Sequence, residues 1–244
     1  MPIGARPAVY SVLDAEVTEL EHRGQHKRMT WLTGRPPGGG SGPEAFYSET
    51  LGENATTRPH FHSVDQFQLF VEGGQRVGST RIEPVVLHYA DAFTPYGPIV
   101  GDDGVHYLTY RARADPGAFF MPESRPLRRE RGGRHATVRV PLRTEIGEGW
   151  TPLIELHDDG LAASCCVLDP AASVRGCGPA LGAGRAYVVA RGSMHVSGRD
   201  HPVLSSLFVQ PGDDVERLVA GSDGLVAVAL GFPGIGAGGR SNAG

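Results

Sequence analysis

The stretch Arg58–Gly74, RPHFHSVDQFQLFVEGG, bears on both the fold and the candidate site. It places two histidines one residue apart, adds a glutamine, continues as a strand-length apolar run and closes on two glycines. Alternate residues of a β-strand project to the same face, so His60 and His62 share a face and Gln66 returns to it at an even spacing. The stretch therefore predicts a strand, a glycine turn and a polar cluster on one face.

Strand-length runs rich in Val, Leu, Phe and Tyr recur along the chain, among them PVVLHYA, HYLTYRA, AYVVARG and LVAVALGF. The 244 residues include 35 glycines and 19 prolines, which separate these runs with frequent turns. Amphipathic helical patterns are scarce. These observations predict an all-β fold of the sandwich or barrel class.

The chain contains an internal repeat, in which QFQLFVEGGQRVG and RAYVVARGSMHVSG each read strand, glycine turn, strand. Aligning Gly73 with Gly192 identifies the residues of the second half that match the polar cluster of the first. The matches of His60, His62 and Gln66 are Pro179, Leu181 and Arg185. The second half therefore lacks the histidines, which indicates that the scaffold folds without them.

The layout resembles the cupin family and, because it occurs twice, a bicupin similar to a bacterial cupin subgroup. The first cupin motif, HxH followed by Glu or Gln and a closing glycine, is matched by His60, His62, Gln66 and Gly73. The PxG of the second motif is matched by Pro95–Gly97, but the histidine expected three residues later is Val100. The resemblance implies two tandem cupin barrels, that is, jelly rolls or double-stranded β-helices.

The repeat also suggests where the domains divide. We expect an N-terminal cupin domain at residues 1–124 that carries the motif, and a linker at 125–144 that contains the basic run RPLRRERGGR. A degenerate C-terminal cupin domain follows at 145–234, and the glycine-rich residues 235–244 are expected to form a flexible tail.

The resemblance implies one divalent transition metal per chain, held in the N-terminal barrel by His60, His62 and Gln66. Two imidazoles and an amide oxygen suit Fe(II), which we favour, or Mn, Ni, Cu or Zn. Val100 leaves a coordination position open, unless His88 or His106 replaces the missing ligand. The alternative is a hydrogen-bonded pair of strand histidines without metal. Candidate substrate-binding residues around the motif are Arg58, Gln68, Phe70 and Tyr96.

These features favour a metal-dependent cupin oxidoreductase, a mononuclear non-heme enzyme of the dioxygenase kind, acting on a small organic molecule. Two alternatives stay open: a small-molecule-binding or structural bicupin without catalysis, and a metal-assisted isomerase or lyase. Cupins host all of these functions, so the fold does not choose among them. The sequence specifies neither the substrate nor a catalytic residue.

The charge balance gives no reason to expect nucleic acid or anionic membranes as partners. Lys and Arg number 23 and Asp and Glu number 27, for a net charge of −4. No apolar stretch approaches the roughly 18 residues of a membrane span, and no signal-peptide pattern is present, so we expect a cytoplasmic protein. We also expect a homodimer, because strands that are apolar on both faces need covering.

Overall fold

The computed structural model describes residues 7–22, 24–34, 42–129, 133–142 and 149–234. These residues form β-strands and two short 3₁₀-helices, with no α-helix among them, so the predicted all-β jelly-roll fold is confirmed. The chain divides into an N-terminal unit, Tyr10–Leu142, and a C-terminal unit made of Met1–Val9 and Arg143–Gly244. Within the described ranges, no helix has the length and apolar character needed to cross a membrane.

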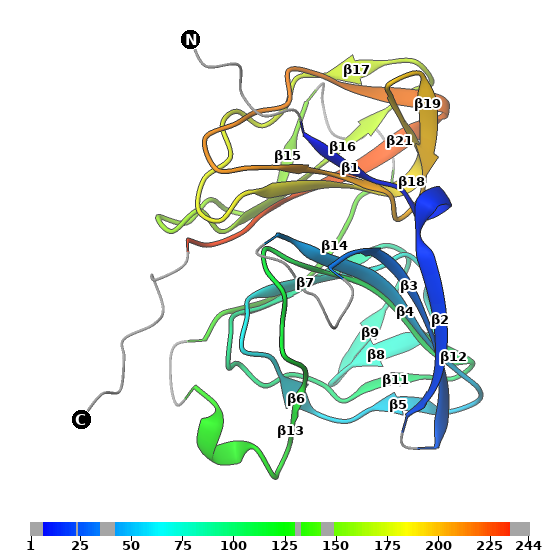
Figure 1. The fold of residues 1–244 in the computed structure, drawn as a ribbon, viewed down its shortest axis with the longest axis vertical. Coiled ribbons are helices and arrows are strands. Elements are labelled where there is room, and N and C mark those ends of the chain that lie inside the picture. The colour runs from blue at the N-terminus through cyan, green and yellow to red at the C-terminus, as the bar shows by residue number, and fades with distance from the viewer. Residues whose placement is uncertain (1–6, 23, 35–41, 130–132, 143–148, 235–244) are drawn as a thin grey trace. The chain divides into compact units, whose positions relative to one another are not determined.

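The N-terminal unit consists of two facing sheets (Figure 1). One sheet has the order β14-β10-β7-β12-β4-β3-β2, the other has the order β5-β11-β8-β9, and β6 pairs with β13. The elements are η1 (Val12–Asp14), β2 (Glu16–His22), β3 (Gln25–Thr33), β4 (Glu44–Leu51), β5 (Ala55–Thr57), β6 (His60–Phe61), β7 (Gln66–Phe70), β8 (Gln75–Val77), β9 (Thr80–Ile82), β10 (Val86–Ala90), β11 (Ile99–Gly101), β12 (Gly104–Arg111), β13 (Phe119–Phe120), η2 (Arg125–Leu127) and β14 (His135–Arg139).

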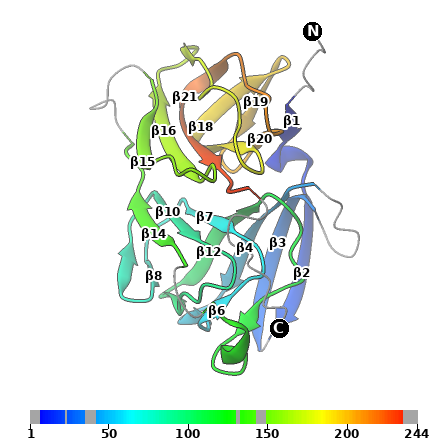
Figure 2. The same cartoon turned by 90° about the vertical axis from the view of Figure 1, so that its left-hand side faces the viewer.

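Strand β7 shows the predicted alternation. Gln66 and Gln68 lie on the inner face and contact Tyr96, whereas the Phe67 ring lies 4.8 Å from Tyr89 of β10. All five residues of the strand are buried, which explains why it reads as an apolar run interrupted by two glutamines. Strands β2, β3 and β4, which supply another wall of the interior, lie side by side in Figure 2.

The C-terminal unit is built around a sheet of order β1-β20-β18-β21-β16-β15, with β19 on β18 and β17 on β21. Its strands are β1 (Ala8–Tyr10), β15 (Thr151–Ile154), β16 (Ala162–Leu168), β17 (Ser173–Val174), β18 (Arg185–Val196), β19 (Arg199–Pro202), β20 (Ser206–Val209) and β21 (Leu218–Gly231). Strand β1 therefore joins residues from the beginning of the chain to a sheet formed near its end.

The strands that the sequence alignment matches, β7 and β18, each lie between two other strands. β7 lies between β10 and β12, and β18 lies between β20 and β21. In the N-terminal unit Gln66 contacts Arg111 of β12, whereas in the C-terminal unit the matching Arg185 pairs with Gly231 of β21. The two units thus share a pairing pattern but differ in the side chains placed at its centre.

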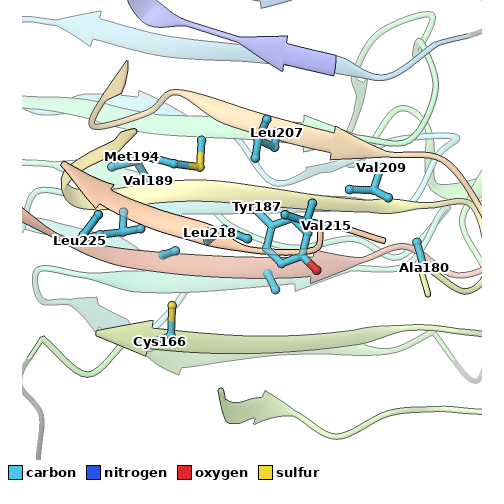
Figure 3. Packing of buried hydrophobic residues seen from close by; sticks show 13 residues of the cluster. Cys166, Ala180, Tyr187, Val189, Met194, Leu207, Val209, Val215, Leu218 and Leu225 are labelled. Carbon is cyan, nitrogen blue, oxygen red and sulfur yellow. The ribbon is translucent and has the colours of Figure 1, made fainter. Parts of the chain in front are cut away.

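Apolar side chains fill the interior of the C-terminal unit (Figure 3). The buried cluster comprises Cys166, Ala180, Tyr187, Val189, Met194, Leu207, Val209, Val215, Leu218, Ala220, Leu225, Ala227 and Ala229. Many come from alternate positions of β18, β20 and β21, as expected for one face of each strand. The C-terminal unit, which lacks the histidines of the first motif, therefore has a packed apolar core.

The division between the units differs from the predicted boundaries. The predicted linker, 125–144, contains η2 and β14, and β14 pairs antiparallel with β10 along its whole length. Arg129 and Arg134 of its basic run pair with the buried Asp91 at 3.2 and 3.0 Å. The segment belongs to the N-terminal unit because it completes the edge of a sheet and neutralises a buried carboxylate. The predicted tail, 235–244, lies outside the described residues.

Candidate functional site

A cavity of about 370 Å³ lies inside the N-terminal unit. Alternate residues of three neighbouring strands supply most of its walls: Lys27, Met29 and Trp31 on β3, Phe46 and Ser48 on β4, and Tyr107, Thr109 and Arg111 on β12. The other wall residues are Leu20, Thr57, His60, His62, Gln68, Ala118 and Phe120. One part of the wall is apolar, and the polar part contains both histidines of the HxH motif.

His60 is buried and neutral. Its backbone exchanges two hydrogen bonds with Tyr96, which fix it at the start of β6. Its Nδ1 lies 2.7 Å from the carbonyl oxygen of Arg58, and only a protonated nitrogen can donate to a carbonyl. The acceptor is therefore Nε2, which lies 2.8 Å from the Tyr96 hydroxyl. Burial, aided by His62, lowers the pKa of His60 to about 3.

The hydroxyl of Tyr96 is fully used by three side chains. It donates to His60 Nε2 and accepts from Gln66 Nε2 at 2.5 Å and from Gln68 Nε2 at 3.1 Å. A phenol has one proton and two acceptor positions, so no capacity is left over. Burial raises the pKa of Tyr96, which keeps the phenol protonated. Tyr96 thereby orients both amides, directing each amide oxygen away from itself.

Arg111, at the end of β12, is 4% exposed and lies among the predicted ligands. Its Nε and one Nη donate to Gln66 Oε1 at 3.1 and 2.9 Å. The same Nη lies 3.1 and 3.3 Å from the ring nitrogens of His62. The other Nη donates to Glu44 Oε2 at 2.5 Å and lies 3.6 Å from Asp115 Oδ2. All three nitrogens of the guanidinium therefore donate to protein acceptors, and Asp115 lies within ion-pair distance.

His62 and Asp115 form a second buried pair. His62 Nδ1 lies 2.7 Å from Asp115 Oδ2, and this carboxylate also accepts from Ser63 and from the backbone N–H of Gly117. Burial opposes ionisation of Asp115, but the hydrogen bond from His62 and the charge of Arg111 hold its pKa below the usual value. Burial and Arg111 also lower the pKa of His62. A neutral imidazole thus donates to an ionised carboxylate.

As these side chains lie, the ligand set predicted from the sequence does not fit a divalent metal. Gln66 Oε1 already accepts two N–H groups from Arg111, and His60 Nε2 accepts the Tyr96 proton. A dication beside the guanidinium would be repelled by several kcal/mol, on the order expected at protein dielectric constants. Among the described residues, no group of three or more His, Cys, Asp or Glu side chains is arranged to hold a metal.

Of the predicted substrate-binding residues, Gln68 lines the cavity and the other three do not. Tyr96 contacts Gln68 through its hydroxyl but is not part of the cavity wall. Phe70 packs against Tyr107 with ring centroids 5.4 Å apart. Arg58 donates to the Met121 carbonyl at 2.5 Å and to Glu123 at 2.8 Å. Its guanidinium therefore binds the segment that contains Met121 and Glu123.

The positions considered for a fourth ligand do not reach the cavity either. Val100 is partly exposed on β11, between Thr56 and Arg76. His106 lies on the opposite face of β12 from Tyr107 and Thr109, because the side-chain period of a strand is two.

His88 is closer to the polar cluster, with its ring centroid 5.0 Å from that of Tyr96. Its Nδ1 lies 2.9 Å from Thr137 Oγ1, and its buried Nε2 has no hydrogen-bond partner among the described residues. Burial, aided by His135, lowers the pKa of His88 to about 4, so the ring is neutral.

Three central residues were missed by reasoning from the sequence: Glu44, Arg111 and Asp115. Arg111 had a usable signal, because it ends the run HYLTYR at an even spacing from Tyr107 and Thr109. Asp115 follows four residues after Arg111, at the end of RARAD. Glu44 had no local signal, since its contact with Arg111 spans 67 residues.

No family model and no curated protein matches the chain, but solved structures match its fold. A candidate dioxygenase from Nostoc punctiforme has a TM-score of 0.63 at 10% identity, covering 94% of this chain and 83% of its own. A variant of Bacillus subtilis oxalate decarboxylase has a TM-score of 0.63 at 12% identity, covering 96% and 78%. Escherichia coli YhhW has a TM-score of 0.57 at 12% identity, covering 93% and 98%. The chain shares the cupin jelly-roll fold.

Proposed function

We propose that the N-terminal unit binds a small organic molecule in its cavity, and that Arg111 organises the polar end of this cavity in place of a metal ion. The observation that carries the proposal is the set of partners of Arg111: Gln66 and His62 of the cupin motif, together with Glu44 and Asp115. A guanidinium is permanently charged, and its planar donors match these acceptors. The motif residues are thus engaged by a cation that belongs to the chain.

The shape and the lining of the cavity support the same proposal. A volume of about 370 Å³ falls within the range of small-molecule sites, which combine apolar walls with a few placed polar groups. The apolar walls come from Leu20, Met29, Trp31, Phe46 and Phe120. The matching interior of the C-terminal unit is packed with apolar side chains, so we propose one site per chain.

A metal-independent site predicts that chelation leaves the protein unchanged. The purified chain is expected to contain far less than one equivalent of Fe, Mn, Ni, Cu or Zn. Its thermal midpoint should stay within about 1 °C after treatment with EDTA, because loss of a tightly bound ligand would lower it measurably. Elemental analysis and calorimetry on the same sample provide the measurement. One equivalent of metal together with a lower midpoint after chelation would contradict the proposal.

A metal-dependent oxidoreductase of the dioxygenase kind is the second candidate, with a metal-assisted isomerase or lyase as its variant. The observation in its favour is that His60 and His62 are both neutral, with ring centroids 5.1 Å apart, and line one cavity. In this alternative, the Tyr96 hydroxyl and the Arg111 guanidinium would have to leave the imidazoles and Gln66. The expected signature is one metal per chain that disappears in the double variant His60→Ala, His62→Ala.

A further inference from the structure

Lys27 is a cation of the cavity wall that has no counter-ion among the described residues. It lies on β3 on the same face as Met29 and Trp31. None of the described residues forms an ion pair with it, whereas its neighbour Arg28, on the opposite face, lies 3.8 Å from Glu49. Burial lowers the pKa of Lys27, and its charge contributes to lowering that of His60. The ammonium group is therefore half-buried, close to the motif and free to bind an anion.

Arg111 cannot play this part, although it lines the same cavity. All three of its nitrogens already donate to protein acceptors, and the carboxylates of Glu44 and Asp115 balance its charge. A ligand anion would have to displace one of these buried partners. Lys27, which has three donors and no such partner in the described ranges, is the better anchor for an anionic group.

A second observation comes from the amide of Gln68. This side chain lines the cavity and is 2% exposed, and its Oε1 has no hydrogen-bond partner within the described part of the chain. Because Nε2 donates to Tyr96, the orientation of the amide is fixed with its oxygen as the unused atom. Buried acceptors are seldom left unpaired, so this oxygen is suited to a donor brought by a ligand.

The apolar wall indicates the body of the ligand. The rings of Trp31 and Phe46 lie with centroids 4.9 Å apart, and Phe120 completes this part of the lining. Aromatic walls bind flat apolar groups well. We infer that the ligand is a small aromatic carboxylic acid with a hydroxyl group, whose carboxylate binds Lys27 and whose hydroxyl donates to Gln68 Oε1. This inference rests on the proposed function of the cavity and specifies its ligand class.

Simple benzoates provide the probes for a test on the full chain. The informative set is 3- and 4-hydroxybenzoate, their neutral counterparts 3- and 4-hydroxybenzamide, and benzoate, which lacks the hydroxyl. The readout is the indole N–H signal of Trp31 in nitrogen–proton NMR. The chain has two tryptophans, and Trp150, in the C-terminal unit, is the internal control. The variant Trp150→Phe assigns the two signals.

The expected result is that the better hydroxybenzoate shifts the Trp31 signal and leaves the Trp150 signal in place. The corresponding benzamide should bind about tenfold more weakly or worse, the range for loss of a hydrogen bond to a charged group. Benzoate should bind several-fold more weakly than the hydroxybenzoate. Lys27→Met should weaken the hydroxybenzoate about tenfold and leave the benzamide unchanged. Arg28→Met, which removes the neighbouring cation of the opposite face, should change neither.

Two other outcomes overturn the inference in distinguishable ways. If benzamides and benzoate shift the Trp31 signal as strongly as the hydroxybenzoates, and Lys27→Met has no effect, the cavity binds small molecules but the ligand class is wrong. If no probe shifts the Trp31 signal at millimolar concentration, both the ligand class and the proposed binding function fail.

Discussion

Replacing Arg111 with methionine is expected to lower the free energy of unfolding of the N-terminal unit by about 3–5 kcal/mol, the range for breaking a buried ion pair from one side. The variant leaves Glu44 and Asp115 buried without their shared cation, and it removes both donors from Gln66 Oε1. Methionine approximates the length of the aliphatic stem, so the loss arises mainly from charge and hydrogen bonding. Urea denaturation of the variant and the parent measures the difference.

The matched control is Arg139→Met, which removes an exposed guanidinium from β14. Arg139 pairs with Glu83 at 3.1 Å, and its side chain is 71% exposed. Surface pairs of this kind contribute about 0–1 kcal/mol, so the control should unfold almost as the parent does. Equal losses in the two variants would show that Arg111 does not hold the buried cluster together.

Acid is expected to weaken the fold well above the range where carboxylates titrate. His60 and His88 are buried neutral, with pKa values lowered to about 3 and about 4, whereas an unfolded histidine titrates near 6.5. Below pH 6.5 the unfolded chain therefore binds more protons, and stability falls with pH until the folded pKa is reached. Between pH 6.5 and pH 5 each histidine accounts for a loss of about 2 kcal/mol.

The variant His88→Gln isolates half of this effect. It should lose about 2 kcal/mol less than the parent over the same pH interval, as measured by urea denaturation at each pH. Glutamine keeps a polar group for Thr137 but does not titrate. The control is His26→Gln, which removes an imidazole whose side chain is 41% exposed. An identical pH dependence in the two variants would show that the burial of His88 does not govern the acid response.

Strand spacing predicted which residues of β7 share a face, but His60 and Gln66 do not lie on one strand, because β6 ends at Phe61 and β7 begins at Gln66. The even spacing of Gln66, Gln68 and Phe70 placed them inside the N-terminal unit, and the alternation of apolar runs indicated an all-β fold. The period of two is a local property of the backbone, so it is readable from sequence. The comparison of the two halves identified the half that lacks the histidines.

Strand spacing could not predict which partners meet inside the unit. Arg111 reaches Glu44 only because β12 pairs with β4, and Asp115 reaches His62 across 53 residues. The HxH motif indicated where polar side chains gather, but not that a guanidinium lies among them. The basic run before β14 was predicted to be a solvated linker because it carries many charges. Two of these charges neutralise Asp91, which lies about 40 residues earlier and so gives no local signal in the sequence.

The position of β1 has a consequence for the order in which the chain is made. About 200 residues separate Ala8 of β1 from the start of its neighbour β20, so at about 5–20 residues per second the two strands leave the ribosome on the order of 10–40 s apart. Until then β1 has no strand to pair with. Strand β1 thus leaves the ribosome well before β20 but is among the last of the described strands to be incorporated, and a chain cut between the two units would leave β20 with an open edge.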